Sequence, residues 1–534
     1  MFGRKSRCLA AAGATATLLA MSLPAIQPAG AAEPQPDSAG RKAVPERFQS
    51  KRLGQIPATD GTAVDVRSAA DGPQTAAPSP DPEAAKPRPL PQIPATGRRP
   101  ALPPSQVDPN GPNVSKDGAR SLELPPNITL LNTDGTIRAE AGGVSPPDPN
   151  AAAGAAQTVE TTNLFMRVRD KSTGAPMCQI SLNTFLGTGD SLTDPRVQFD
   201  SAANRFNLVI TIKAASSAVA PALWVAATAG PDACGTWFRY RLNVPRAPGS
   251  TLDFPNLGQD RNGLVITTQN VPFGASFPQD YSAFVLPKSA IYTGTTPGVT
   301  LFGVNRNTAP ALVAGHPMLA TSATYLLSAD SEIGYVVYQA TNTGSANASI
   351  QAVYFVDAPF SEPPGAVRQC TGVGFNLPAP RGELTANIVQ TEAHLWFAHT
   401  TSLGGMSTVR YGAIHIVTGT LFAAFAFHSP TSSDYNPSIG VGIFDVNLYF
   451  VYVNWAYVDT MAAPCQNSSV AVNVALPNEG VPDLDGTDGT AVIGGPAPIA
   501  DRFGDYSSVS IDPTPPQGCI HGSTAVIDQQ YYGP

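Results

Sequence analysis

The sequence predicts an all-β fold, a six- or seven-bladed β-propeller preceded by a disordered Pro-rich arm. The main observation is a recurring phrase: a Pro after a polar or aromatic residue, then alternating apolar residues, often closed by Asp. Its starts lie 60, 62, 120 and 69 residues apart, and 120 is two periods of 60. Such a period, built of strands, is typical of propeller blades, which cannot bury both faces alone. The phrase starts at Asp194-Pro195, Phe254-Pro255, His316-Pro317, Asn436-Pro437 and, with Tyr in place of Pro, Asp505-Tyr506.

Period-two alternation continues nearly everywhere after Ile128, as in Phe238–Val244 and Val409–Ile416, with turn clusters between these segments. This pattern indicates half-buried strands joined by hairpins. With Asp148-Pro149 as a further start, six or seven blades are expected over about 390 residues, and the first strand is expected to join the last blade. A β-helix would need a shorter repeat, and a pair of jelly rolls would not give equal spacing.

Residues 1–32 have the order of a secretory signal peptide. Basic Arg4, Lys5 and Arg7 precede an apolar stretch from Cys8 to Leu23, and small residues follow at the exit. No later segment offers about 18 uninterrupted apolar residues, so no membrane span is expected. We therefore expect a secreted protein, extracellular or periplasmic.

Residues 33–126 are expected to form a disordered or extended linker. They hold 19 Pro in 94 residues and one aromatic side chain, Phe48, which leaves little to build a core. The segment also contains a near-copy, Gln55–Thr59 and Gln92–Thr96, both reading Gln-Ile-Pro-Ala-Thr. A recognition peptide and a chance duplication in a biased segment both explain the copy.

The propeller region, residues 127–534, is acidic, with 17 Lys and Arg against 29 Asp and Glu. Because phosphate binding needs clustered basic side chains, this balance argues against nucleic acid as a partner and leaves cations or neutral sugars. The segment from Asp483 to Gly489 alternates carboxylates and glycines but lacks the bidentate Glu of an EF-hand. Asp483, Asp485 and Asp488 therefore form either a weak calcium site or a plain acidic turn, and no other cofactor is expected.

Five cysteines remain after the signal peptide, which in an oxidising compartment predicts two disulfides and one free thiol. Cys178 and Cys234 lie in adjacent early repeats, and Cys465 and Cys519 lie in adjacent late ones. We predict these two pairs, with Cys370 left free. No pair has the spacing of zinc ligands.

Six motifs occur in a characteristic order: Ser145–Ala151, Val168–Gly174, Asp194–Asp200, Phe254–Gly258, Pro287–Ser289 and Arg502–Pro513. Together they resemble a family of secreted bacterial β-propeller proteins, mostly of unassigned activity and in some cases labelled sialidase-like from the fold. The resemblance spans roughly residues 141–534 and implies the fold without a reaction. Two places depart from the family pattern, the segment Asn150–Ala156 and Phe503, where the family usually has Trp.

One further motif, Asp232-Ala-Cys-Gly-Thr-Trp237, is similar to the aspartate box of sialidase-type propellers, in which Asp bonds a turn and Trp packs between blades. A structural role is expected for it. A sialidase-like hydrolase would also need three arginines, a Tyr–Glu pair and an acid Asp, and no Glu stands in a recognisable position. The candidate arginines are Arg196, Arg261, Arg410 and Arg502.

The polar residues that open each phrase are the candidate ligand-binding residues. If each opens an inner strand, rotation about the propeller axis brings them to one mouth of the channel, with a calcium ion or the Arg502 guanidinium between the carboxylates. The alternative is that each side chain caps its own turn. The candidates are Asp148, Asp194, His316, Asn436, Arg502, Asp505 and Tyr506.

The sequence therefore predicts a monomeric, exported β-propeller that binds an extracellular glycan or protein at the channel mouth. The alternative is a sialidase-like, glycan-active hydrolase or lyase that uses the channel-mouth carboxylates. Whether the chain is an enzyme stays open at this point.

The first prediction concerns export. Because the basic, apolar and small-residue segments occur in signal-peptide order, mass spectrometry of the exported protein should find an N-terminus close to Glu33. Exported protein that retains Met1 would contradict it.

Overall fold

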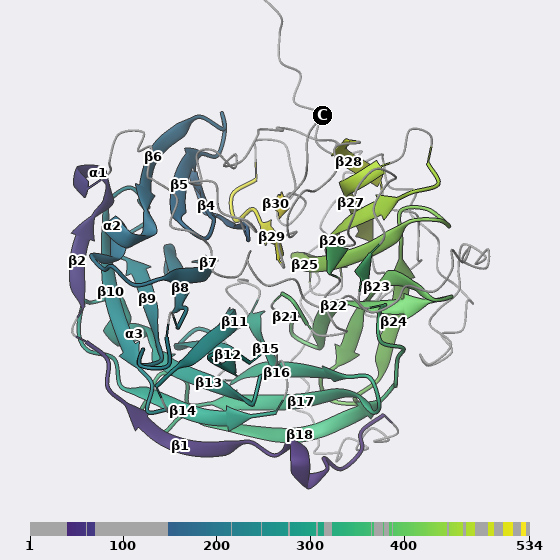
Figure 1. The fold of residues 1–534 in the computed structure, drawn as a ribbon, viewed down its shortest axis with the longest axis horizontal. Helices are drawn as coiled ribbons and strands as arrows, with labels where there is room; N and C mark the ends of the chain where they lie inside the picture. Colours follow the sequence, from purple (N-terminus) through teal and green to yellow (C-terminus); the bar gives the residue numbers. More distant parts are fainter. Residues whose placement is uncertain are drawn as a thin grey trace, which may run out of the picture.

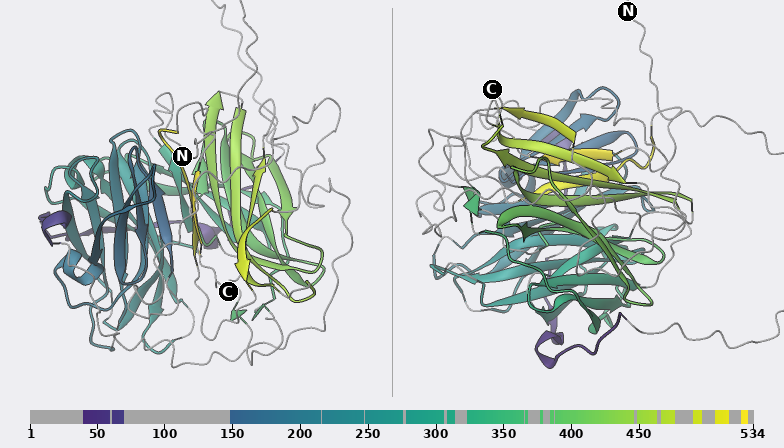
Figure 2. Two further views of the ribbon diagram at one scale, coloured as in Figure 1. Left: turned by 90° about the horizontal axis from the view of Figure 1, so that it is seen from above. Right: turned by 90° about the vertical axis from the view of Figure 1, so that its right-hand side faces the viewer.

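The computed structural model describes residues 40–59, 61–69, 148–214, 216–246, 248–275, 278–305, 308–313, 323–364, 366–367, 377–378, 384–386, 388–445, 448–462, 466–475, 490–495, 506–515 and 525–529. Nearly all of these residues lie in or between β-strands, arranged as sheets around a common axis (Figure 1). Views turned by 90° show the strands running along this axis (Figure 2). The predicted all-β propeller fold is confirmed.

Most strands form four-stranded antiparallel sheets in chain order, which we number as blades. Blade 1 consists of β3 (Asn150–Ala153), β4 (Gln157–Thr161), β5 (Phe165–Asp170) and β6 (Pro176–Ser181). Blade 2 consists of β7 (Leu192–Asp200), β8 (Arg205–Ile212), β9 (Ala222–Thr228) and β10 (Thr236–Asn243). Blade 3 consists of β11 (Ser250–Gln259), β12 (Gly263–Pro272), β13 (Asp280–Pro287) and β14 (Val299–Val304).

The second half of the chain continues the pattern. Blade 4 consists of β15 (Thr308–Val313), β16 (Ala323–Asp330), β17 (Gly334–Thr341) and β18 (Ser349–Asp357). Blade 5 consists of β21 (Ile388–Gln390), β22 (His394–Leu403), β23 (Met406–His415) and β24 (Leu421–Ala426). Blade 6 consists of β25 (Ser433–Asp445), β26 (Leu448–Asp459), β27 (Gln466–Ala475) and β28 (Thr490–Gly495).

The remaining elements are short. They are the pair β19 (Ala366–Val367) and β20 (Leu377–Pro378), the hairpin β29 (Ser507–Ile511) and β30 (Ala525–Gln529), and the helices α2 (Leu182–Leu186) and α3 (Lys288–Ile291). Near the axis, β15 pairs in parallel with β11 and with β21, which links blades 3 to 5. The total blade count, six or seven, stays a prediction, because much of the chain around β29 and β30 lies outside the described residues.

The hydrophobic core lies between the blades. Apolar clusters fill the seams of successive pairs, from blades 1 and 2 through to blades 5 and 6. Strand β17 is therefore buried along most of its length, because blades cover both of its faces. Each blade depends on its neighbours to bury its surface, as the repeat predicts.

The Pro of the phrase interrupts the inner strands. Asp148, Asp194, Phe254 and Asn436, each followed by Pro, have φ of 48°, 58°, 54° and 50°. In blades 2, 3 and 6 the strand register shifts at these residues, which is a β-bulge. Pro has no N–H for the ladder, so a bulge accommodates it, and a left-handed conformation of a non-glycine residue stores strain.

The Asp that closes the phrase links neighbouring blades. Asp200 accepts backbone hydrogen bonds from Ala202 and Ala203, both at 3.0 Å, and its other oxygen accepts a 2.6 Å bond from Lys288 of blade 3. Asp512, after β29, accepts a 2.5 Å bond from Lys171 of blade 1. The closing Asp thus caps a turn and holds the next blade in place.

Ring closure by the first strand joining the last blade stays a prediction, because much of the chain around β29 and β30 lies outside the described residues. The hairpin β29–β30 lies between β25 of blade 6 and β3 of blade 1 (Figure 1). Ala151 N–H donates to Ser508 Oγ and Ala153 N–H donates to Ser510 Oγ, each at 2.9 Å. Side-chain hydroxyls of β29 therefore bond to the backbone of β3 in the described part of the chain.

The predicted disordered arm needs a larger correction. Residues 40–69, which we call the belt, contain η1 (Glu46–Phe48), β1 (Lys51–Ile56), β2 (Thr62–Asp65) and α1 (Val66–Ala69) and lie along the outer rim (Figure 1). Strand β1 pairs with β14 of blade 3, and β2 pairs with β10 of blade 2. The rest of the arm lies outside the described residues.

Three apolar side chains explain why the belt is ordered. Phe48 lies in the seam between blades 3 and 4, Ile56 between blades 2 and 3, and Val66 between blades 1 and 2. The belt has no core of its own, as its composition indicates, but it adds side chains to cores that the propeller supplies. It also covers strand edges that would otherwise be open to pairing.

The disulfide between Cys178 of β6 and Cys234 of blade 2 is confirmed. It joins blades 1 and 2 near the end of the belt, where Arg67 N–H donates to the Cys234 carbonyl at 2.8 Å. Cys370, Cys465 and Cys519 lie outside the described residues, so the second pair stays a prediction.

The second prediction tests the docking of the belt. Phe48 is only 1% exposed, and truncating a buried Phe costs about 3–5 kcal/mol. Phe48→Ala should therefore loosen the belt and speed proteolytic cleavage within residues 40–59. Leu53→Ala in β1 is the control, because Leu53 is 48% exposed and should not change the cleavage rate. Unchanged resistance in Phe48→Ala would show that this ring does not hold the belt.

Candidate functional site

Several phrase-opening residues lie in one hydrogen-bonded network at the axis. Asn163 Nδ2 donates to Asp148 Oδ2 at 2.8 Å, and the backbone N–H of Asp194 donates to Asn163 Oδ1 at 2.8 Å. One amide side chain thereby connects the opening residues of blades 1 and 2. Asp148 and Asp194 are both buried.

Asp194 is the centre of this network. Its Oδ1 accepts a 2.8 Å bond from the Thr193 hydroxyl. Its Oδ2 accepts two bonds, from the Tyr506 hydroxyl at 2.9 Å and from the backbone N–H of Phe254 at 3.1 Å. A single carboxylate therefore joins blade 2, blade 3 and the residue before β29.

Arg196, two residues after Asp194, connects blades across the axis. Its Nε donates to the Pro255 carbonyl at 2.9 Å, and a terminal nitrogen donates to the Thr385 carbonyl, just before β21, at 2.8 Å. Its guanidinium carbon lies 3.5 Å from the centroid of the Tyr506 ring, a cation–π contact. Arg196 and Tyr506 are both buried, so this contact is shielded from solvent.

Asn436 joins the network through its backbone. The Ser507 hydroxyl donates to the Asn436 carbonyl at 2.8 Å, and the Asn436 N–H donates to Thr400 Oγ1 at 3.3 Å. Ser507 follows Tyr506, which donates to Asp194, so blade 6 belongs to the same hydrogen-bonded network as blades 1 to 3.

The charged groups of the network shift the pKa of Tyr506. Burial raises its pKa well above the usual 10, and the charge of Asp194 acts in the same direction, with smaller contributions from Asp253 and Asp148. Arg196 acts in the opposite direction. The phenol is therefore a neutral hydrogen-bond donor to Asp194 over the physiological pH range.

One side of the network is accessible. Asp253 and Phe254 are half-buried, whereas their neighbours Pro255 and Asn256 are buried. The Phe254 ring lies 4.8 Å from that of Tyr506, measured between centroids. An acidic and an aromatic residue, both half-buried, thus lie at the edge of the network, a combination that can contact the hydroxyl groups and the apolar face of a polar ligand.

The structure brings together Asp148, Asp194, Asn436 and Tyr506 of the predicted ligand-binding set. His316, Arg502 and Asp505 lie outside the described residues, as do Asp483, Asp485 and Asp488 of the predicted calcium loop. In the described part of the chain no group of three or more His, Cys, Asp or Glu side chains is placed to hold a metal ion. Among the described residues, the Arg196 guanidinium lies on the ring of Tyr506, which donates to Asp194, and the expectation of calcium or Arg502 between the carboxylates stays a prediction.

Sequence reasoning missed three members of the network. Arg196 was considered only as a sialidase-type arginine, and Asn163 and Asp253 were not considered. Arg196 stands two residues after the opening Asp194, a position that other copies of the phrase fill with Asn256 and Ser438, so the repeat did not mark it. Asn163 lies in the turn between β4 and β5, outside the phrase, so the repeat gave no sign of it.

The aspartate box has the structural role that we predicted. Asp232 Oδ1 accepts bonds from the N–H of Cys234 at 3.0 Å and from Gln157 at 2.9 Å. Trp237 is completely buried in the seam between blades 1 and 2, and its indole N–H donates to the Ala233 carbonyl at 2.8 Å.

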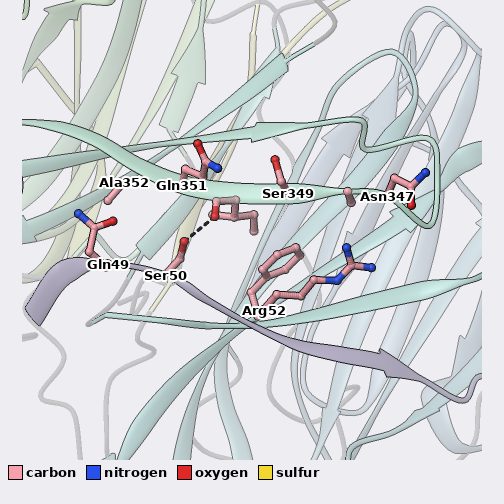
Figure 3. A pocket seen from close by; sticks show the side chains of 10 residues that line it. Gln49, Ser50, Arg52, Asn347, Ser349, Gln351 and Ala352 are labelled. Atoms are coloured by element: carbon pink, nitrogen blue, oxygen red, sulfur yellow. Dashed lines mark hydrogen bonds between the residues drawn. The ribbon is translucent and has the colours of Figure 1, made fainter. Parts of the chain in front are cut away.

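A second feature is a polar groove of about 430 Å³ on the outer rim (Figure 3). One wall is the start of β18 with the turn before it, and the other is the belt. Ser50 Oγ donates to the Ile350 carbonyl, and Arg52 donates to the Ala346 carbonyl at 2.7 Å. Amide and hydroxyl side chains give the groove many hydrogen-bonding groups. The sequence did not predict this groove, because one of its walls belongs to the arm that was expected to be disordered. The polar lining residues are Gln49, Ser50, Arg52, Asn347, Ser349 and Gln351.

No family model and no curated protein matches the chain. Solved structures with a similar arrangement include an exo-β-1,3-galactanase from Phanerochaete chrysosporium, with 9% identity, a TM-score of 0.30 and coverage of 68% of this chain and 91% of that one. They also include an endo-arabinanase from Bacillus licheniformis, with 13% identity, a TM-score of 0.23 and coverage of 52% and 92%. A xylan β-1,4-xylosidase from Bacillus halodurans has 9% identity, a TM-score of 0.23 and coverage of 68% and 84%. These neighbours are glycoside hydrolases, but likenesses this distant say nothing about the activity of this chain.

Within the described residues, no helix is both long enough and apolar enough to cross a membrane.

The third prediction concerns the Tyr506–Asp194 bond. Tyr506→Phe removes a donor from a buried carboxylate, which should lower the free energy of unfolding by about 1–3 kcal/mol. Tyr240→Phe is the control, because its hydroxyl donates to a neutral carbonyl, that of Ile291 at 3.0 Å, and should cost less. Chemical denaturation measures both. Equal losses would show that the charge of Asp194 adds nothing to the bond.

Proposed function

We propose that the chain is a non-catalytic binding protein that acts outside the cytoplasm and holds a glycan at the axial end of the propeller. The observation that carries the proposal is the half-exposed pair of Asp253 and Phe254 on a network with an excess of carboxylates. The charges of Asp148, Asp194 and Asp253 raise the pKa of Tyr506, and the Arg196 guanidinium lowers it. Such a site favours neutral ligands with many hydroxyl donors over anionic ones.

Backbone strain at the same place supports the proposal. The four residues with positive φ that precede Pro belong to four different blades, and strain of this kind, about 1–3 kcal/mol per residue, is often found at functional sites. The Cys178–Cys234 disulfide and the order of residues 1–32 support action in an oxidising compartment outside the cytoplasm.

The arrangement of Asp194 argues against the hydrolase alternative. A glycosidase needs one carboxyl group that can protonate the leaving oxygen and a second that acts as nucleophile or base. Both oxygens of Asp194 accept hydrogen bonds from protein groups, and the side chain is 6% exposed. Asp194 is therefore placed to hold the ring together, and binding is the simpler role for the accessible neighbours.

The fourth prediction is binding by the exported protein on a glycan array. We expect a set of neutral glycans to bind, and Phe254→Ala and Asp253→Asn to weaken binding at least tenfold while far-ultraviolet circular dichroism stays unchanged. Asp190→Asn is the matched control, because Asp190 is also a half-buried carboxylate beside an aromatic residue, Trp224, in blade 2. An array without any bound glycan, or an equal loss of glycan binding in Asp190→Asn, would overturn the proposed site. A protein would then be the remaining candidate ligand.

A further inference from the structure

The duplicated segment of the arm has a defined structural role in its first copy. Residues Gln55–Thr59 lie in the belt, at the place where it crosses from blade 3 to blade 2. Ile56 is 6% exposed, and its side chain enters the apolar seam between these blades. The same five residues recur at Gln92–Thr96, and the function proposed above makes no use of either copy.

Most contacts of the first copy use its backbone. Gln55 and Ile56 pair with Thr300 and Val299 of β14. The Asn243 N–H of β10 donates to the Pro57 carbonyl at 3.4 Å. An extended peptide thus adds a strand to an exposed sheet edge, which is a common mode of peptide recognition.

The final residue of the segment adds a specific contact. Thr59 N–H donates to the Arg241 carbonyl at 3.1 Å, and Arg241 N–H donates to Thr59 Oγ1 at 2.9 Å. Ile56 and Thr59 therefore determine which sequences fit, one through a buried side chain and the other through a hydroxyl acceptor.

We propose that this surface, formed by β14, β10 and the seam between them, is a sequence-selective peptide site, and that Gln92–Thr96 is its second ligand within the same chain. The second copy has every residue that makes these contacts, in the same order. The 51 residues from 97 to 147 can span about 170 Å when extended, so the second copy reaches the site without displacing blade 1.

The first copy outcompetes the second in the intact protein. Phe48 and Val66 anchor it on both sides, and the corresponding positions of the second copy, 37 residues later, are Ala85 and Pro103. Gly54 has φ of 129° at the bulge of β1, and Pro91 at the corresponding position cannot adopt this angle. The second copy therefore occupies the site only when the first is weakened.

Four full-length exported proteins test the proposal: the wild type, Ile56→Asp, Ile93→Asp and the double variant. The readout is hydrogen exchange at the backbone amides of Arg241 and Asn243, which the segment covers. Ile93→Asp should match the wild type. Ile56→Asp should retain protection because the second copy binds in place of the first, and the double variant should lose at least tenfold in protection.

Equal protection in Ile56→Asp and in the double variant, whether lost in both or kept in both, would overturn the proposal. A free peptide of residues 88–98, added to the double variant, provides a second measurement. It does not depend on the chain segment that connects the second copy to blade 1. The free peptide should restore protection at Arg241, whereas the same peptide with Ile93→Asp should not. Failure of the wild-type peptide to restore protection would also overturn the proposal.

Discussion

The propeller depends on one buried interaction, the contact of Arg196, Tyr506 and Asp194 at its axis. A ring of blades that each bury their faces on their neighbours is stable only when it is closed, because an open ring exposes two apolar faces. Tyr506 donates to Asp194 from a position 312 residues later in the chain, and Arg196 lies against its ring. The segment that enters β29 is thereby joined to blade 2 at the point where several blades meet.

The Pro of the repeated phrase explains why side chains join the inner strands of neighbouring blades. An inner strand with Pro cannot complete a backbone ladder at that position, so its neighbours are held by carboxylate, amide and guanidinium groups. The same residues both bend the strand and supply the bonds between blades. The carboxylate of Asp194 accepts bonds from Thr193, Phe254 and Tyr506, and ligand binding by the phrase-opening residues stays a prediction.

The sequence was sufficient for the parts of the structure that repeat. The phrase spacing predicted the propeller, and the adjacent repeats predicted the pairing of Cys178 with Cys234. It was insufficient where a contact joins segments with no shared pattern. The belt was missed because its Pro content and lack of a core describe the isolated segment, whereas Phe48, Ile56 and Val66 are buried by blades distant in sequence. The axial role of Arg196 likewise depends on Thr385, which no periodicity connects to it.

The axial contact also bears on how the proposed ligand binds. Arg196 and Tyr506 are buried, whereas Phe254 and Asp253 are half-buried, so the proposed ligand contacts the latter pair. Phe254 also donates its N–H to Asp194 and packs on Tyr506, so a ligand on this ring contacts the interaction that closes the propeller. A ligand that binds only the closed ring stabilises it in proportion to its own affinity. Under the proposed function, ligand binding and ring closure are therefore coupled through Phe254.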